Sequence, residues 1–340
     1  MPINQKQKII VILGPTASGK SSLSIKLAKK FNGEIISADS RQVYQGMDIG
    51  TGKVTKKEQG LIKHHLLNVV NPKKVFTVSD FKKLGEKAIK EILGKNKIPI
   101  IVGGTGLYID TLVYNLNFPQ VPPNQLLRLS LNRLTAEQLF YKLKNLDLQR
   151  AKTIDHHNKR RLIRALEIID SIGKVPTLNT KYYIENTKYD VLWLGLKPKN
   201  LENKIKLRLN KRLKKGMIKE IKDLLESGVS KKRLHDLGLE YRQISEYLAS
   251  KNYKVTTRKR SERSSNPMEQ WSHGRRRMTE SVKNFKKSEY YQKLLREIVK
   301  YSKRQMTWFK INKEIHWLAQ NKVEGIKTQK EAEKLLQSFL

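Results

Sequence analysis

The chain has 340 residues, enough for one large or two ordinary domains with a hydrophobic core. Lys and Arg number 70 and Asp and Glu 31, so the formal net charge is +39, and there is no Cys. The lack of Cys excludes disulfides, thiolate catalysis and cysteine metal sites, and no apolar run approaches the roughly 18 residues of a membrane span. The cationic excess is larger than solubility requires and favours a polyanionic partner over a surface that is merely rich in lysine.

Taken in chain order, the N-terminal part alternates short apolar runs with segments of helical spacing. The run at 9–13 is apolar, rich in β-branched residues and bounded by Gly14, which is typical of a buried parallel strand. The expected strands are 9–13, 34–37 and 98–102, and the expected helices are 21–31 and 80–93, the second with Ser79 as its N-cap. This alternation predicts an α/β fold, in which a parallel sheet is flanked by helices.

Beyond Pro123 the pattern changes to helices alone, which predicts a small all-helical insertion. A strand returns at 189–196, and further helices follow it. Residues 254–287 are rich in Arg and Lys and almost without aliphatic side chains, so we expect them to form a flexible basic insertion. The expected organisation is an α/β core (1–122), the helical insertion (123–186), the continued core (187–253), the basic insertion (254–287) and C-terminal helices with a short strand near Ile315 that complete the core (288–340).

Residues 14–21 match the phosphate-binding pattern G-x-x-x-x-G-K-[ST], directly after the first strand and at the start of a helix. In such a loop the glycines let backbone N–H groups face an anion, Lys20 reaches phosphate oxygens, and the Ser21 hydroxyl can ligate Mg²⁺. The alternative is a glycine-rich turn with a chance lysine, which the flanking strand and helix disfavour. The loop therefore predicts a P-loop NTPase-like sheet, but it does not say which phosphate is bound.

Two strand ends modify this prediction. The strand at 98–102 runs into Gly103, Gly104 and Thr105, where most nucleotidases with this loop carry an Asp that helps to hold Mg²⁺. Asp39 follows the strand at 34–37 and so lies at the edge of the sheet where open α/β folds bind ligands. A turn or cap role for Asp39 is equally compatible with the local sequence.

With these motifs the chain resembles the tRNA dimethylallyltransferase family, also called tRNA isopentenyltransferases. The resemblance begins with the phosphate loop and continues with Ser-Ala-Asp-Ser-Arg-Gln-Val-Tyr from residue 37. The matching segments, in the family's order and over nearly the whole chain, are 14–21, 37–51, 64–66, 102–108, 160–167, 238–243 and 303–309.

The resemblance implies transfer of a dimethylallyl group from dimethylallyl diphosphate to the N6 amine of an adenine next to the tRNA anticodon, with Mg²⁺ as cofactor. It implies that Asp39 is the general base, that Thr105 and Arg242 are further catalytic residues, and that Ser21 ligates the metal. The residues expected to hold the diphosphate are Gly14, Thr16, Ala17, Ser18, Gly19, Lys20 and Ser21. Those expected to contact the anticodon stem-loop of tRNA are Asp39, Ser40, Arg41, Gln42, Arg128, Arg160, Arg161 and Arg164.

Arg160, Arg161 and Arg164 fall within an arc of roughly 100° on a helix, a cationic stripe suited to a phosphate backbone, although a lone stripe of this kind is more often a solvated face. Glu240 occupies a position that is usually small or apolar in the family. Trp308 and Phe309 are interpreted as core residues.

Two other classes of protein remain open. A small-molecule kinase or ATPase would explain Lys20, but neither Asp39 nor the charge. A non-catalytic RNA-binding module would explain the charge, but the intact Lys20, Ser21, Asp39 and Thr105 argue against it. For the prenyltransferase that the resemblance implies, we expect a monomeric cytoplasmic protein that does not enter a membrane.

Overall fold

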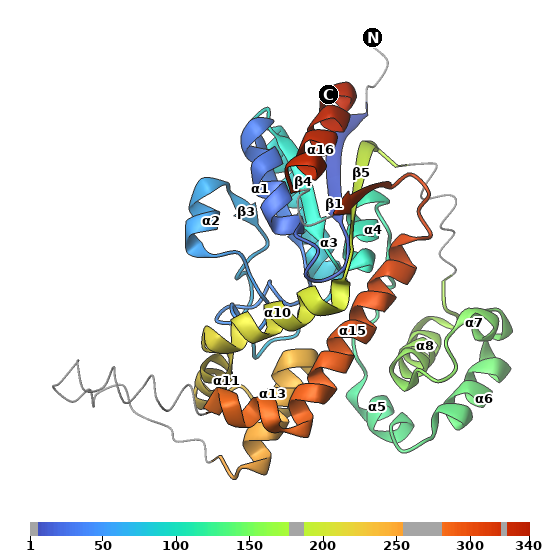
Figure 1. Ribbon diagram of the computed structural model, residues 1–340. Helices are drawn as coiled ribbons and strands as arrows, with labels where there is room; N and C mark the ends of the chain where they lie inside the picture. Colours follow the sequence, from blue (N-terminus) through green and yellow to red (C-terminus); the bar gives the residue numbers. More distant parts are fainter. Residues whose placement is uncertain (1–5, 177–186, 254–280, 321–324) are drawn as a thin grey trace. The chain divides into compact units, whose positions relative to one another are not determined.

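The structure is a computed structural model that describes residues 6–176, 187–253, 281–320 and 325–340. Its centre is one sheet of six parallel strands in the order β3-β2-β4-β1-β5-β6 (Figure 1). The predicted parallel α/β sheet is therefore confirmed. The strands are β1 (Gln7–Leu13), β2 (Gly33–Ala38), β3 (His64–His65), β4 (Ile98–Gly103), β5 (Tyr189–Pro198) and β6 (His316–Gln320).

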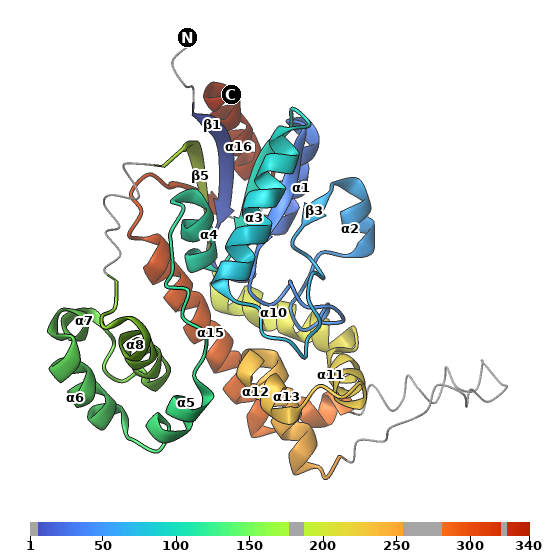
Figure 2. The same ribbon diagram turned by 180° about the vertical axis from the view of Figure 1, so that it is seen from behind.

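Helices cover both faces of the sheet, which is why the central strands are continuous apolar runs. The β1 residues from Ile9 to Leu13 are almost completely buried. Ile10 and Ile12 pack with Leu23 of α1 in one apolar cluster. Figures 1 and 2 show opposite faces of the sheet, the first covered by α1 (Lys20–Lys30) and α16 (Gly325–Phe339), the second by α3 (Val78–Leu93) and α4 (Gly106–Val113).

The start of α3 differs from the expectation. Ser79 lies inside the helix, and Thr77 is the N-cap, because Thr77 and Asp80 form a reciprocal capping box. The Thr77 hydroxyl accepts from the Asp80 backbone N–H at 3.2 Å, while the Asp80 carboxylate accepts from the Thr77 N–H at 2.8 Å. A capping box satisfies two N–H donors at the helix end, one more than a lone serine cap would. The helix therefore begins directly after Thr77 and not after Ser79.

A helical layer packs below the carboxyl edge of the sheet (Figure 1). Its apolar core contains Leu209, Ile221, Tyr241 and Leu294, one from each of four helices. The helices outside the sheet faces are α2 (Lys56–Leu61), α10 (Leu201–Lys214), α11 (Met217–Glu226), α12 (Lys231–Leu237), α13 (Leu239–Ser250) and α15 (Glu289–Phe309).

The basic stretch predicted to be flexible over 254–287 is corrected at its C-terminal end. Residues 281–287 are helical, and Phe285 is completely buried. Its ring packs edge-on against Tyr247 and Tyr291, with centroid separations of 5.0 and 6.1 Å. Phe285 and, beside it, Val282 pack against the core and so order a segment that is otherwise polar. Residues 254–280 lie outside the described residues.

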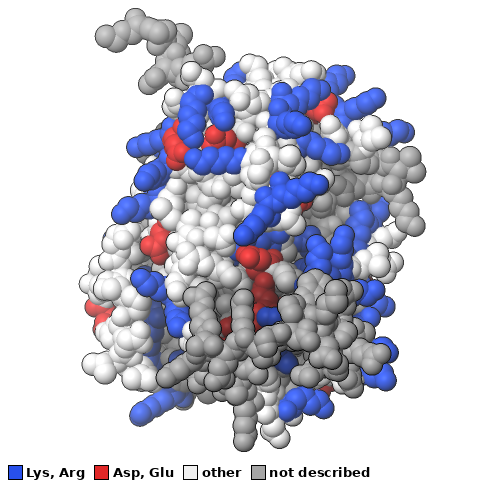
Figure 3. All heavy atoms as spheres, turned by 90° about the vertical axis from the view of Figure 1, so that its left-hand side faces the viewer, with Lys and Arg blue, Asp and Glu red and all other residues white. Residues whose placement is uncertain are grey.

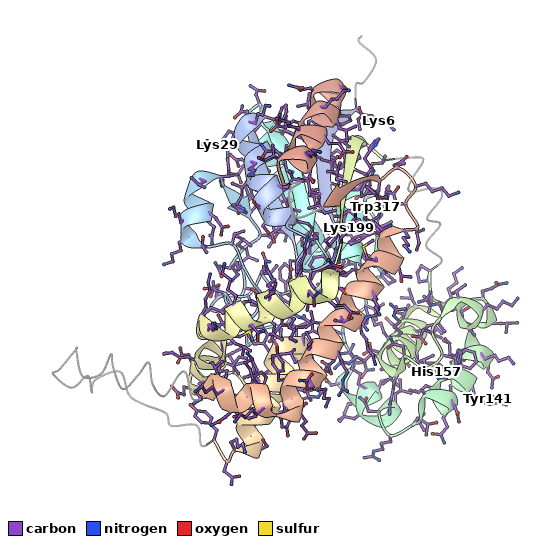
Figure 4. The ribbon with its side chains drawn as sticks, viewed as in Figure 1. Lys6, Lys29, Tyr141, His157, Lys199 and Trp317 are labelled. Atoms are coloured by element: carbon purple, nitrogen blue, oxygen red, sulfur yellow. The ribbon has the colours of Figure 1, made fainter. Side chains whose placement is uncertain are left out.

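The chain divides into two compact units, Met1–Val113 with Lys188–Leu340, and Tyr114–Thr187. The described part of the second unit contains helices and no strand, as predicted for the insertion. Its own core is built from side chains such as Leu139, Leu143 and Leu162. Tyr141 of α6 and His157, which precedes α8, are labelled in Figure 4. The helices are α5 (Gln125–Leu131), α6 (Ala136–Leu146), α7 (Leu148–Thr153) and α8 (Lys159–Ile172).

Among the residues that the structure describes, no helix has the length and apolar character that a membrane span requires.

Candidate active site

The site lies where three neighbouring strands end. β2, β4 and β1 are adjacent, and their last residues pair in register, Ala38 with Gly103 and Gly103 with Leu13. Because the strands are parallel, the segments that follow them leave the sheet at one edge. The structure therefore brings together the phosphate loop (14–21), Asp39 and Thr105.

The phosphate loop is shaped by its glycines. Gly14 has φ +147°, and a Cβ there would lie 2.7 Å from the carbonyl oxygen of Leu196, so no other residue fits. Gly19, at φ 86°, precedes the first turn of α1 and has no side chain to cap it. The N–H groups of that turn are consequently free to bind an anion.

Lys20 is held by its own loop. Its ammonium donates to the carbonyl oxygens of Gly14 at 2.8 Å and Pro15 at 2.7 Å. Withdrawal from water and, to a lesser extent, the charge of Arg208 lower the pKa of Lys20 from 10.5 to about 7, although Asp39 acts in the opposite direction. A bound anion would restore the charge of this lysine.

Asp39 combines the two roles that the sequence left open. Its Oδ1 accepts the backbone N–H groups of Arg41 at 2.8 Å and Gln42 at 3.3 Å, so the residue caps a turn. It also lies at the ligand-binding edge of the sheet. Both hydrogen bonds that Asp39 accepts from described residues reach Oδ1, which leaves Oδ2 as the oxygen that can take a proton.

Thr105 ties this turn to the end of β4, since its hydroxyl accepts the Ser40 N–H at 3.3 Å. Tyr301 of α15 lies near Thr105 and Asp39, and both residues influence its titration. Desolvation raises the pKa of Tyr301 to about 12, so the phenol stays protonated at neutral pH. Sequence reasoning missed Tyr301, which is one of several tyrosines in its segment and becomes distinctive only when α15 crosses the site.

Helix α15 contacts both the phosphate loop and the turn between β4 and α4. The buried Gln305 accepts the Thr16 N–H at 3.0 Å and donates to the carbonyl oxygen of Gly104 at 2.7 Å. Trp308 donates to Asp110 at 2.8 Å, and its indole lies against Gly106, where a Cβ would be 2.3 Å away. The segment 303–309 therefore holds the phosphate loop and the β4–α4 turn together.

Only one of the two aromatic residues in this segment belongs to the core. Phe309 is 3% exposed, but Trp308 is 40% exposed. The expectation that both are core residues is thus wrong for Trp308, whose indole N–H is used at the surface by Asp110.

Arg208 of α10 is a functional candidate that sequence reasoning missed. It donates to the carbonyl oxygen of Gly52 at 3.0 Å and lies close enough to Lys20 and Asp39 to affect the titration of Lys20 and to interact with Asp39. Because α10 is rich in Lys and Arg throughout, the sequence offers no signal that singles out this arginine.

Arg242, the arginine expected to help hold the diphosphate, forms an ion pair with Glu297 of α15 at 2.9 Å. The unusual Glu240 is buried and hydrogen-bonded to the guanidinium of Arg212. The two carboxylates thus each engage an arginine of the helical layer, whereas Arg208 is an arginine whose charge lowers the pKa of Lys20.

The residues expected to contact tRNA fall in both units. Ser40, Arg41 and Gln42 form the turn capped by Asp39. In the insertion, Arg160 and Arg161 are exposed on α8. The other two arginines, Arg128 and Arg164, are engaged by a buried glutamate of their own unit.

That glutamate is Glu167, which is 1% exposed. It accepts Nε and Nη2 of Arg128 at 2.6 and 2.7 Å and Nη1 of Arg164 at 3.3 Å. Desolvation alone would raise its pKa, but Arg128, the Asn124 N–H and Arg164 together hold it below the ordinary value. Charge-assisted bonds of this kind fix the direction of a guanidinium.

The surface agrees with a polyanionic partner. On the face shown in Figure 3, blue Lys and Arg side chains are widely spread and red Asp and Glu are fewer. Lys199, directly after β5, adds a cation at the carboxyl edge of the sheet (Figure 4).

Comparison with known proteins gives a consistent result. The family described as IPP transferase matches residues 42–312. The tRNA dimethylallyltransferase of Anoxybacillus flavithermus is 43% identical over 225 residues, 66% of this chain and 72% of that protein. That of Oceanobacillus iheyensis is 39% identical over 251 residues, 72% and 80% of the two chains.

Solved structures are similar over almost the whole chain. The full-length tRNA isopentenylpyrophosphate transferase of Bacillus halodurans has a TM-score of 0.65 and 30% identity, covering 98% of this chain and 97% of its own. A eukaryotic dimethylallyltransferase described as acting on tRNA has a TM-score of 0.71 and 25% identity, covering 97% and 78%.

Proposed function

Because the chain belongs to the IPP transferase family and is an enzyme of that family, we propose that it moves a dimethylallyl group from dimethylallyl diphosphate to the N6 amine of an adenine next to the tRNA anticodon, releasing diphosphate. The observation that carries this proposal is the meeting of the phosphate loop, Asp39 and Thr105 at one edge of the sheet. An anion site and a carboxylate side by side suit the transfer of a group from a diphosphate to a weak nucleophile.

The loop and its neighbours bind the diphosphate in this proposal. Charge accumulates on diphosphate as the C–O bond to the prenyl group breaks, and fixed donors stabilise that charge. The N–H groups of the loop and of the first turn of α1 supply the donors, while Lys20 and Arg208 supply positive charge. Thr105, whose hydroxyl accepts the Ser40 N–H, lies at the same edge.

Magnesium fits this site in one particular way. Among the described residues there is no group of three His, Asp or Glu side chains that could hold a metal ion. Mg²⁺ commonly binds through a few protein oxygens together with substrate phosphates and water, so Ser21 together with the diphosphate could hold it. The ion would then neutralise part of the charge on the leaving group.

Asp39 is the proposed base. The adenine amine is a weak nucleophile, and a carboxylate that takes its proton assists the attack on the prenyl carbon. Oδ1 is engaged in the turn, so Oδ2 accepts the proton. The cationic surface and the arginines of the insertion bind the RNA, in which an unpaired loop base enters a pocket at lower cost than a paired one.

A kinase or ATPase is disfavoured by the end of β4. There the chain continues as Gly104 and Thr105, where such enzymes hold Mg²⁺ with an Asp. Gly104 instead receives the Gln305 amide on its carbonyl oxygen. ATP hydrolysis that depends on Lys20 and needs no tRNA would reverse this preference.

The test is mass spectrometry of tRNA nucleosides after incubation of unmodified tRNA with the protein, dimethylallyl diphosphate and Mg²⁺. We expect one adenosine next to the anticodon to gain the mass of the prenyl group, and Lys20→Ala to abolish most of the product. Tight tRNA binding without any mass gain would instead identify a non-catalytic RNA-binding module.

A further inference from the structure

Glu220 of α11 collects an unusual number of hydrogen bonds. Its carboxylate is buried, and Oε2 accepts the backbone N–H groups of Asp48 at 2.8 Å and Ile49 at 2.6 Å. Oε1 accepts the Gly50 N–H at 2.9 Å and the Tyr241 hydroxyl at 2.9 Å. One side chain therefore binds the N–H groups of three consecutive residues in the segment that follows the Asp39 turn.

The carbonyl groups of the same segment face two arginines of α10. Arg212 donates to the Gly50 oxygen at 2.6 Å, and Arg208 donates to the Gly52 oxygen at 3.0 Å. Glu220 thus binds N–H donors of the segment, and the two arginines bind carbonyl acceptors of the same segment.

The glycines of the segment make these contacts possible. A Cβ at Gly50 would lie 2.6 Å from the Tyr241 ring, and a Cβ at Gly52 would lie 2.1 Å from Nη2 of Arg208. Gly52 also has φ +63°, which other residues rarely adopt. The Arg208 guanidinium therefore lies directly against Gly52, two residues after the backbone that Glu220 binds.

We infer that Glu220 is a positioning residue for the diphosphate site: by anchoring residues 48–50 it places the Gly52 carbonyl that orients the Arg208 guanidinium. The inference rests on the proposed function, since it assigns Arg208 to the diphosphate. Glu220 itself does not touch the substrate; it acts through the loop and through Arg208.

A double-mutant cycle tests this chain of contacts. Binding of inorganic diphosphate with Mg²⁺ is measured by calorimetry for the full-length wild type, Glu220→Gln, Arg208→Ala and the double variant. Glu220→Gln replaces one acceptor oxygen by an NH₂ group that faces backbone donors, and we expect about tenfold weaker binding, the size of one charge-assisted hydrogen bond. In the Arg208→Ala background the same change should cost less than about twofold, because coupled residues are non-additive.

Glu226→Gln is the matched control, since Glu226 lies on the same helix and accepts a hydrogen bond from Tyr253 at 2.5 Å, away from the loop. It should leave diphosphate binding within about twofold of wild type. tRNA affinity of Glu220→Gln should also stay close to wild type, because none of the residues proposed to contact RNA is hydrogen-bonded to Glu220.

If Glu220→Gln does not fold, Tyr241→Phe takes its place in the cycle, because this substitution removes one of the four hydrogen bonds to Glu220 and keeps the carboxylate. A smaller loss of diphosphate affinity that again disappears in the Arg208→Ala background supports the inference. Equal losses in both backgrounds, or no loss at all while Arg208→Ala weakens binding, overturn it. A wild type that does not bind diphosphate contradicts the proposed function instead.

Discussion

Lys20 shows how a single residue can make ligand binding depend on pH. Its pKa in the free protein is about 7, so the ammonium is mostly charged at pH 6 and mostly neutral at pH 8. A bound diphosphate raises that pKa, because an opposite charge favours the charged form. Binding above pH 7 therefore requires proton uptake at Lys20, whereas binding below pH 7 does not.

We predict that at pH 8 diphosphate binding takes up close to one more proton in the wild type than in Lys20→Arg, whose guanidinium is charged throughout. Calorimetry in two buffers of different ionisation enthalpy measures the uptake. Subtracting the value for the arginine variant removes the contribution of protons that the diphosphate itself gains or loses on binding. Equal proton uptake by the two proteins would show that Lys20 is already charged in the free loop.

At the same scale, the sequence locates some site residues and not others. Lys20, Asp39 and Thr105 are predictable because each follows a recognisable strand, and strand ends share one edge in a parallel sheet. Arg208 and Glu220 are not, because each lies on a charge-rich helix. Their roles depend on which backbone groups the fold brings opposite them, and no local pattern encodes that.

At the scale of elements, long periodic segments were predictable and short ones were not. β1, β4 and α3 carry clear patterns, so the errors there concern boundaries, as at Thr77. β3 has two residues, too few for any period to show, and it forms because β2 offers it an edge. The helix at 281–287 was missed because only Phe285 and Val282 anchor a segment whose composition is otherwise polar.

The insertion supplies a prediction at this scale. Glu167→Gln removes a negative charge, which by charge count alone should strengthen tRNA binding. We expect the opposite, a loss of about tenfold, because Arg128 and Arg164 lose the carboxylate that directs them. The unit should also be destabilised, since breaking a buried ion pair typically costs about 3–5 kcal/mol.

Asp170→Asn is the control for that prediction. Asp170 is exposed on the same helix, so its substitution removes an equal charge without disturbing the arginines. Filter binding with tRNA and thermal unfolding compare the two variants. Similar tRNA affinities for both would mean that Glu167 does not orient RNA-binding side chains.

At the scale of the whole molecule, the net charge of +39 predicts a strong salt dependence. Each phosphate neutralised by Lys or Arg should contribute roughly 0.7 to 0.9 to the slope of log affinity against log salt. With three or more such contacts, tRNA affinity should fall about tenfold or more between 50 and 200 mM salt. Titrations at four salt concentrations measure the slope. An affinity that does not change with salt would show that the positive charge of the protein does not contribute to RNA binding.

The role of Asp39 as general base is tested by the single-turnover rate of prenyl transfer by Asp39→Asn at saturating tRNA and dimethylallyl diphosphate. The amide oxygen can still accept the N–H groups of Arg41 and Gln42, so the turn should persist and tRNA affinity should stay within about twofold of wild type. If Asp39 takes the proton of the adenine amine, the transfer rate should fall by about 10² to 10⁴, the usual contribution of a positioned base. Transfer at nearly the wild-type rate would show that Asp39 only caps the turn and would contradict the proposed chemistry.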